Sequence, residues 1–283
     1  MNTTSPDHPA FALDAYKIIA KGEYAYAVEG DRPQCPQCQG SGYARVNIDG
    51  VITMGRCRCM MLPDRIALFN KAGIPSRYAN TTFVSFAQDK NGQLKDLDPA
   101  AIRALGHCSQ FVDQYQTAVE NKGMVLYGEV GRGKTHLMIA MLRELVFRHG
   151  VAVRFVEFAR LLSMLKEGYS SGRSDAGILG ELATVPVLAV DELGKGRLTD
   201  WELTIIDEVI SRRYNAMGCT LATSNYTPGE PTGAAPPNLA TSTQLNQTLG
   251  DRVGDRVYSR LVQLVDFVQV EGKDHRAIVS SSV

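Results

Sequence analysis

Short apolar runs alternate with amphipathic stretches along most of the chain, and this alternation predicts strands that are followed by helices. Three apolar runs, at residues 124–127, 185–190 and 219–223, have the length and composition of strands buried on both faces. Residues 152–157 form a fourth candidate strand. Such an order is typical of an α/β domain built on a doubly wound parallel sheet.

Helices are expected where apolar residues recur every three to four positions. After the strand at 124–127, the residues Leu137, Met141 and Leu145 recur at intervals of four, and Gly150 ends the pattern. Further helices are expected at residues 11–27, 64–72, 99–121, 158–167 and 200–216, and Gly218 ends the last of them.

Two stretches lack any such period. Residues 1–10 are a polar tail, and residues 228–247 are so rich in Pro, Gly, Ala, Ser and Thr that they cannot bury a core. The second stretch is therefore expected to be a flexible insertion. A turn at residues 73–76 marks a boundary, so we expect an N-terminal part at 1–72 and a larger α/β domain at 73–283.

Length and composition support this division. The chain has 283 residues, of which 44% are hydrophobic, which is enough for one sizeable domain and a small module. Its 30 basic and 30 acidic residues balance, so nucleic acid would have to meet a local patch. No apolar run reaches the length of a membrane span, and the first residues do not resemble a signal peptide. We expect a cytoplasmic protein with no membrane contact.

The strongest chemical signal is the stretch Gly-Glu-Val-Gly-Arg-Gly-Lys-Thr at residues 128–135, which fits G-x-x-x-x-G-K-[ST] at every fixed position. Gly128, Gly131 and Gly133 allow the backbone N–H groups to cradle phosphates. Lys134 is expected between the β- and γ-phosphates, and Thr135 is expected to offer its hydroxyl to Mg²⁺. A chance glycine-rich turn is the alternative. The flanking strand and helix argue against it, so the loop predicts nucleotide binding.

A pair of acidic residues at the end of another predicted strand indicates that the bound nucleotide is hydrolysed. The strand at 185–190 ends in Asp191 and Glu192, at the edge where α/β proteins place ligands. Asp191 is expected to hold Mg²⁺, and Glu192 to polarise the attacking water. A solvated Asp-Glu pair at a helix start is the alternative. Asn225 follows the next strand and is expected to contact the γ-phosphate or the water, although Ser-Asn is also ordinary turn chemistry. Together these residues predict an NTPase.

Four of the six cysteines predict a metal site. They form the pairs Cys35 and Cys38, and Cys57 and Cys59, with eighteen residues between the pairs. Thiolates in this pattern favour a closed tetrahedral Zn²⁺ site within a segment at 34–61, whose arms at 43–46 and 51–54 would form a hairpin. Two disulfides are the first alternative, which a cytosolic compartment disfavours, and unligated thiols are the second. Cys108 and Cys219 are expected to be buried core residues.

The order of motifs resembles the DnaC/DnaI-type replicative helicase loaders, which are AAA+ ATPases whose ATPase domain is shared with the transposition helper IstB. The resemblance covers about residues 34–279, and the insertion is its main departure. It is carried by the four-cysteine segment, Ile-Pro-Ser-Arg-Tyr at 74–78 with Thr82 and Phe83, the Walker A loop at 128–135, the Walker B residues Val-Asp-Glu at 190–192, Ile-Ser-Arg-Arg at 210–213 and Arg-Val-Tyr-Ser-Arg-Leu at 256–261.

The resemblance implies ATP as the nucleotide, a hexameric replicative helicase bound by the N-terminal module, and single-stranded DNA as a further partner. It implies that Arg260 is an arginine finger, with Arg256 as its companion, and hence self-association through a shared ATP site. Because residues 250–253 nearly repeat 254–257, Arg252 remains an alternative in a shifted register, and a solvated helix face is the other interpretation. Arg276 is a weaker candidate for a nucleotide sensor.

The resemblance also places a DNA-contacting element at the helix 158–167 and the loop after it. Arg160, Lys166 and Arg173 would meet phosphates there, whereas the apolar positions of the same helix form a packing stripe.

Two other functions stay open. An IstB-like transposition helper that regulates a transposase is one alternative, against which the four cysteines argue because IstB-type chains generally lack them. The other is a binding module, because residues 35–42 match the C-x-x-C-x-G-x-G unit of DnaJ-type zinc domains. Those domains repeat the unit, and it occurs once in this sequence.

Overall fold

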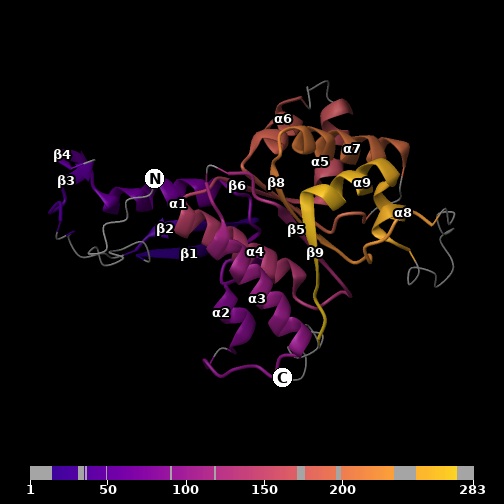
Figure 1. Ribbon diagram of the computed structural model, residues 1–283, viewed down its shortest axis with the longest axis horizontal. Coiled ribbons are helices and arrows are strands. Elements are labelled where there is room, and N and C mark those ends of the chain that lie inside the picture. Colours follow the sequence, from indigo (N-terminus) through magenta and orange to yellow (C-terminus); the bar gives the residue numbers. More distant parts are fainter. Residues whose placement is uncertain are drawn as a thin grey trace.

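The computed structural model describes residues 15–30, 35, 37–48, 50–89, 91–117, 119–170, 176–195, 199–232 and 247–272. A parallel sheet of five strands forms its centre, in the order β6-β7-β8-β5-β9 (Figure 1). The strands are β5 (Gly123–Tyr127), β6 (Val153–Glu157), β7 (Val187–Asp191), β8 (Cys219–Ser224) and β9 (Val265–Gln269).

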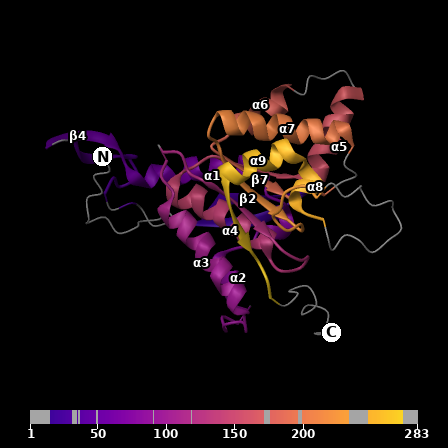
Figure 2. The same cartoon turned by 45° about the vertical axis from the view of Figure 1, so that its right-hand side comes forward.

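Helices cover both faces of this sheet (Figures 1 and 2). One face packs against α1 (Met61–Lys71), α3 (Pro99–Gln114), α4 (Lys134–Glu144) and the π-helical turn η3 (Leu145–His149). The other packs against α5 (Phe158–Ser170), α6 (Ala176–Thr184), α7 (Asp200–Asn215), α8 (Leu249–Val253) and α9 (Asp255–Leu264). This three-layer arrangement confirms the expected doubly wound α/β fold.

The central strands are apolar on both sides because both faces are covered. In β5, Met124 and Leu126 belong to the core under α3 and α4, whereas Val125 between them belongs to the core under α5 and α7. Leu126 and Val125 are fully buried. Each such side chain contributes about 1.5–3 kcal/mol relative to an exposed one. The continuous apolar run therefore reports burial on two faces rather than on one.

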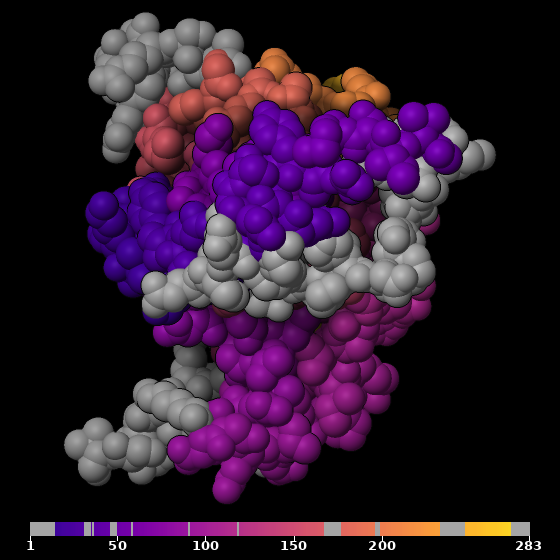
Figure 3. Space-filling view, turned by 90° about the vertical axis from the view of Figure 1, so that its left-hand side faces the viewer, coloured from indigo at the N-terminus to yellow at the C-terminus, as the bar shows by residue number. Residues whose placement is uncertain are grey.

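Two hairpins precede the central domain, β1 (Tyr16–Lys21) with β2 (Tyr24–Glu29) and β3 (Tyr43–Ile48) with β4 (Val51–Arg56). In Figure 3 the N-terminal segments, in indigo and purple, lie between the salmon helices above and the magenta helices below. The β3–β4 hairpin confirms the two arms expected between the cysteine pairs. The turn η1 (Arg58–Met60) links it to α1.

The helix expected at residues 11–27 is wrong over its described part. Residues 16–29 form the β1–β2 hairpin, joined by the two-residue turn of Gly22 and Glu23. Gly22 has φ of 61°, and glycine at the first turn position suits a two-residue hairpin. The alternation of Tyr24, Ala25, Tyr26 and Ala27 has period two, since both alanines are buried in β2. Residues 1–14 lie outside the described part.

Other boundaries moved by a few residues. The helix expected at 99–121 ends at Gln114, the one expected at 158–167 extends to Ser170, and the strand expected at 185–190 runs from Val187 to Asp191. Of the expected insertion at 228–247, residues 233–246 lie outside the described part. None of the helices in the described part of the chain is both long enough and apolar enough to span a bilayer.

The N-terminal elements share a core with the sheet. Ala25 and Ala27 of β2 and Phe69 of α1 belong to the same buried cluster as Met138 of α4. The backbone N–H of Ala25 also donates to the carbonyl of Ile74 at 2.8 Å. The division at residues 72 and 73 stays a prediction, and packing continues across that point.

Candidate functional site

The phosphate-binding loop lies between the end of β5 and the start of α4, as expected. Gly128 and Gly133 both have positive φ, at 137° and 91°. A Cβ atom at Gly128 would lie 2.5 Å from the carbonyl oxygen of Val270, and one at Gly133 would lie 2.6 Å from Cε2 of Phe86. Both positions therefore require glycine for space as well as for conformation. The loop leads into the N-terminus of α4, where phosphate is stabilised.

Lys134 is buried, and its ammonium group lies over the loop. The Nζ atom donates to the carbonyl oxygens of Gly128 at 2.7 Å and Glu129 at 2.6 Å. Arg132 holds the loop from outside, because its guanidinium donates to Glu129 and to the carbonyl of Gly272. Lys134 is thus fixed at the position from which an ammonium reaches nucleotide phosphates.

Asp191 meets the loop from the end of β7. Thr135 donates its hydroxyl hydrogen to Asp191 Oδ1 at 2.8 Å, and Thr223 donates to the same oxygen at 2.6 Å. Asp191 is only 2% exposed. The structure thus brings together the hydroxyl and the carboxylate that the sequence assigned to Mg²⁺, and hard oxygen ligands of this kind suit that ion.

Burial dominates the electrostatics of this carboxylate. It raises the pKa of Asp191 above its ordinary value, while the hydrogen bonds from Thr223 and Thr135 oppose that shift. The negative charges of Glu192 and Glu157 raise the pKa further. Negative charge therefore accumulates where a cation would be stabilised.

Glu192 adopts an unusual backbone conformation directly after β7. Its φ is 59°, in the left-handed region that residues other than glycine seldom adopt. Its N–H donates to Thr223 Oγ1 at 2.9 Å, and the N–H of Leu193 donates to the carbonyl of Thr223 at 2.8 Å. The Glu192 carboxylate pairs with Lys195 at 2.5 Å. Backbone strain of this kind is often found at functional sites.

The loop and the acidic strand end open on one cleft of about 750 Å³. Lys134, Thr135, Glu192 and Asn225 line it. Lys134 and Thr135 open α4 after the loop that follows β5, and Glu192 and Asn225 directly follow β7 and β8. All four therefore lie at the carboxyl ends of parallel strands, where open α/β sheets bind ligands. A nucleotide-sized pocket therefore lies where the motifs predicted it.

The opposite wall of this cleft comes from residues that the sequence gave no role there. Phe86 of α2 (Phe83–Ala87) and Tyr78 of the turn η2 (Ser76–Tyr78) line it, together with His136 and Lys95. His136 Nε2 lies 2.9 Å from the carbonyl oxygen of Thr82. Burial and the charge of Asp191 raise the pKa of the Tyr78 phenol. Tyr78 ends the Ile-Pro-Ser-Arg-Tyr stretch at 74–78, one of the motifs that carry the family resemblance. No other feature of the sequence pointed to a role for Tyr78.

Thr223 was also missed. It lies at the end of a predicted strand, and the sequence indicated no function for it. A polar run of Thr223, Ser224 and Asn225 closing an apolar strand was the available signal.

The arginines proposed as arginine fingers are not among the residues that line the cleft. Arg260 of α9 donates to Asp207 Oδ1 of α7 at 2.7 Å and to the hydroxyl of Ser211. Arg256 lies 3.7 Å from Asp207, and 73% of its side chain is exposed. Arg252 is buried, donates to the carbonyl of Gly194 at 2.9 Å and lies 5.0 Å from the ring centre of Tyr226. Arg276 lies outside the described residues.

Arg213 ends the resemblance motif at 210–213, and the sequence gave it no structural role. It is fully buried, and the bonds shown for its guanidinium in the described part of the chain run to the Thr220 hydroxyl and to backbone carbonyls. These carbonyls belong to the end of α6 and the segment after it, and to Cys219 in β8. Burial lowers the pKa of Arg213 to about 10. Arg213 therefore ties the end of α6 to the start of β8.

The helix assigned to DNA contact is α5. Arg160 pairs with Glu23 of the β1–β2 turn at 2.6 Å and lies 5.4 Å from the ring centre of Tyr24. Lys166 lies 5.1 Å from the ring centre of Trp201. The apolar positions Phe158, Leu161 and Leu165 are buried, which confirms the packing stripe. Arg173 lies outside the described residues.

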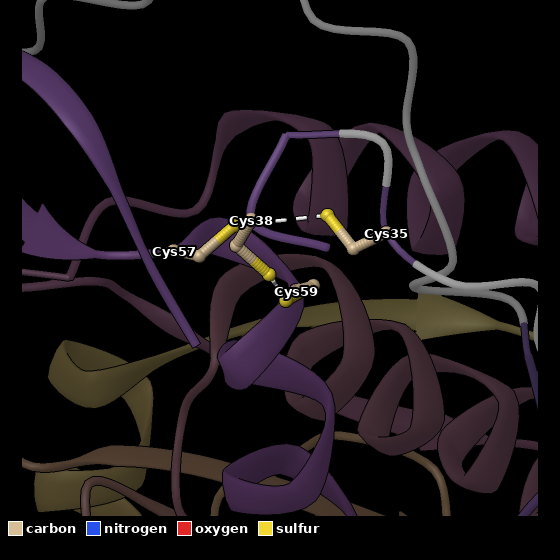
Figure 4. A group of neighbouring side chains, drawn as sticks. All are labelled: Cys35, Cys38, Cys57 and Cys59. Carbon is tan, nitrogen blue, oxygen red and sulfur yellow. Dashed lines mark hydrogen bonds between the residues drawn. The ribbon is translucent and has the colours of Figure 1, made fainter. Parts of the chain in front are cut away.

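The four cysteines form a second site (Figure 4), next to the β3–β4 hairpin that lies at one end of the molecule in Figure 1. Cys35 and Cys38 come from the loop before β3, Cys57 follows β4, and Cys59 lies in η1. All four side chains are buried, and their sulfur atoms lie within 4.8 Å of one another. The separation is 3.5 Å for the sulfurs of Cys38 and Cys59 and 3.8 Å for those of Cys35 and Cys57.

These separations fit a metal better than disulfides. Sulfur atoms in a disulfide lie about 2.05 Å apart, and all six cysteines are free thiols. Four sulfurs placed about 2.3 Å from a central Zn²⁺ lie about 3.8 Å from one another, which matches the observed spacing. Burial raises the pKa of the Cys59 thiol to about 12. The group can hold a metal ion, and its four thiols leave no open position for catalysis.

The sheet order and the cleft define an ATP-binding P-loop protein of the AAA+ class. The family model described as IstB-like ATP binding protein matches residues 80–281, so the chain belongs to the IstB-like ATP binding proteins.

The relatives place it with the DnaC/DnaI type, as the motif order suggested. The replicative helicase loader DnaC of Escherichia coli (strain K12) is 28% identical over 190 residues, 67% of each chain. The replicative helicase loader DnaI of Bacillus subtilis (strain 168) is 29% identical over 136 residues, 47% of this chain and 42% of that protein. A crystal structure of the DnaC helicase loader matches with a TM-score of 0.55 and 27% identity, over 69% of this chain and 99% of that one.

Proposed function

We propose that this chain is an ATP-dependent loader that binds a hexameric replicative DNA helicase and delivers it to single-stranded DNA in replication initiation. The observation that carries the proposal is the presence, in one chain, of a nucleotide cleft and a separate four-thiol module. The relatives named replicative helicase loaders supply the function that joins the two.

In this proposal the cleft hydrolyses ATP. Lys134 and the loop N–H groups bind the β- and γ-phosphates, and Thr135 and Asp191 hold Mg²⁺, which when bound neutralises charge on the phosphates. Glu192 orients and polarises the attacking water, and Asn225 contacts the water or the γ-phosphate. The support is that the described side chains of all these residues meet at the carboxyl ends of neighbouring strands.

The thiol cluster in this proposal holds Zn²⁺ as a structural ion. Its ligands are Cys35, Cys38, Cys57 and Cys59, and the sulfur spacing supports them. The ion would fix the loop before β3 against the turn after β4, so that the β3–β4 hairpin has a rigid base. Residues 1–72 would then form the helicase-binding part, and residues 73–283 the AAA+ ATPase part.

We assign the arginine finger to Arg260, with Arg256 as companion, supplied to the ATP site of a neighbouring copy. The argument against Arg252 is its burial and its bond to Gly194, which leave it no reach to another chain. Self-association through a shared ATP site follows from that assignment. Hydrolysis per molecule should then rise with protein concentration.

Single-stranded DNA is proposed to contact α5 and the loop after it, where Arg160 and Lys166 project from the helix. We place the protein in the cytoplasm, where its helicase and DNA partners would be found.

Co-purification with the host replicative helicase tests the proposal. We expect wild type to retain the helicase and about one equivalent of zinc, and Cys35→Ser with Cys38→Ser to lose both. Cys108→Ala, which changes a buried thiol outside the cluster, is the matched control and should keep both. Retention of the helicase by the double variant would contradict the proposed partner site. Retention of a transposase by wild type, with no helicase, would establish the IstB-like transposition helper instead.

A further inference from the structure

The near-repeat at residues 250–257 places two arginines in opposite environments. Its copies both read Gly-Asp-Arg-Val, and Gly254 joins the helices α8 and α9. Arg256 in the second copy is exposed, whereas Arg252 in the first is only 6% exposed. The proposed function gives Arg256 a task at a neighbouring copy and gives Arg252 none. Because a buried charge is costly unless it is hydrogen-bonded, the partners of Arg252 indicate its role.

Arg252 bonds to the turn that begins with Glu192. Its Nε atom donates to the carbonyl oxygen of Gly194 at 2.9 Å, and its Nη1 atom donates to Gln247 Oε1 at 3.3 Å. The ring centre of Tyr226, just after β8, lies 5.0 Å from the guanidinium. Gly194 is buried, and a Cβ atom there would lie 3.0 Å from the Cβ of Arg252. Helix α8 therefore packs directly on the turn that follows β7.

Strand β8 holds the same turn at its beginning. The N–H of Glu192 donates to Thr223 Oγ1 at 2.9 Å, and the N–H of Leu193 donates to the carbonyl of Thr223 at 2.8 Å. Glu192 and Gly194 both have a left-handed backbone, with φ of 59° and 85°. Glycine adopts this conformation freely but glutamate does not, so Glu192 keeps it only where its surroundings fix the turn. Thr223 fixes the first half of the turn, and Arg252 fixes the second.

We propose that Arg252 is a positioning residue for Glu192: by holding the Gly194 carbonyl it sets the direction in which the Glu192 carboxylate faces the cleft. The inference rests on the proposed role of Glu192 in polarising the attacking water. Glu192 is among the residues that line the cleft and Arg252 is not, so the arginine acts through the turn rather than on the nucleotide. A displaced carboxylate leaves ATP binding intact but no longer aligns the water, and a misplacement of about 1 Å can cost about 100-fold in rate.

Steady-state phosphate release at varied ATP concentration tests the proposal. We expect Arg252→Met to lower kcat by about tenfold or more while KM stays within about twofold, because the carboxylate acts in the transition state and not in ATP binding. Arg252→Lys keeps the charge and one donor for Gly194, so it should lose less of the rate. Arg213→Met is the matched control, since Arg213 is a buried arginine bonded to a carbonyl at the start of β8, away from the cleft. It should keep kcat near wild type wherever urea unfolding shows it folded.

A double variant separates positioning of Glu192 from general packing. If Arg252 acts through Glu192, adding Arg252→Met to Glu192→Gln should not slow single-turnover hydrolysis further. The same fractional loss in both backgrounds, an unchanged kcat in Arg252→Met, or a raised KM with unchanged kcat would overturn the inference. Should the methionine variant not fold, Arg252→Gln takes its place in both backgrounds. Full hydrolysis by Glu192→Gln alone would instead refute the proposed role of Glu192.

Discussion

Thr223 donates its hydroxyl hydrogen to Asp191 Oδ1 at 2.6 Å, and the Thr223 hydroxyl oxygen accepts a hydrogen bond from the backbone N–H of Glu192 at 2.9 Å. One threonine on β8 therefore positions both acidic residues at the end of β7. Because Glu192 has a left-handed backbone, its orientation depends on this support from the neighbouring strand.

We expect Thr223→Val to lower the rate of ATP hydrolysis by about tenfold or more, since supporting hydrogen bonds around a metal site are worth about 10- to 100-fold. Valine keeps the shape of the strand but leaves Asp191 one hydrogen bond short and the Glu192 N–H without its acceptor. We expect a loss of about 1–3 kcal/mol in the free energy of unfolding as well. Thr223→Ser retains the hydroxyl and should keep most of the activity. Turnover measurements and urea unfolding check both points, and full activity of the valine variant would refute this role.

Glu192→Gln is expected to reduce hydrolysis by about 100-fold or more while ATP still binds, because the amide cannot act on the attacking water. Binding of a fluorescent ATP analogue and phosphate release measure the two quantities separately. Lys195→Ala removes the ion-pair partner of Glu192. Because the Lys195 side chain is 55% exposed, the change should alter hydrolysis by only a few-fold. Unchanged phosphate release in Glu192→Gln would mean that the acidic strand end has another function.

Arg213→Met is expected to lower the free energy of unfolding by about 3–5 kcal/mol, the range for breaking a buried network around a charged group. The change leaves the carbonyls of Leu182 and Val185 without their donor in the interior. Urea unfolding is the measurement. Arg212→Met, next along α7 and 46% exposed, is the control and should stay within about 0.5 kcal/mol of wild type. Similar losses in the two variants would argue against the structural role.

Glu23→Gln should change stability little, because exposed ion pairs contribute about 0.2–1 kcal/mol. If α5 meets DNA phosphates, Glu23 competes with them for Arg160, so the variant should bind single-stranded DNA a few-fold more tightly at low salt. Arg160→Ala should bind more weakly, and fluorescence anisotropy measures both. Glu181→Gln is the control, because it removes the ion-pair partner of Arg154, which does not lie on α5. It should leave the affinity for single-stranded DNA unchanged. Weaker or equal binding by Glu23→Gln would rule out the competition.

The sequence predicted the phosphate loop and the acidic strand end because each is contiguous. Gly128 to Thr135 carries its geometry in its glycines, and an apolar strand that ends in Asp191 and Glu192 marks the edge of a sheet. The cysteine cluster was predictable for the same reason, since two close pairs around a hairpin converge with little help from the rest of the fold.

The error at residues 11–27 has a local cause. The period of two in β2 is carried by only two buried alanines, and Gly22 interrupts the segment. The hairpin is stable because β2 packs on α1 and bonds to residues 74–76, contacts that no window of neighbouring residues contains.

The sequence alone determined that a nucleotide binds between β5 and α4 and that acidic residues end a neighbouring strand, because backbone conformation and burial leave periodic marks on adjacent residues. Only the tertiary structure decided that Thr223 supports Asp191 and that Arg213 joins α6 to β8. These are hydrogen bonds between residues distant along the chain, and their partners are fixed by the strand order and by how the helices pack on the sheet, which no local pattern records.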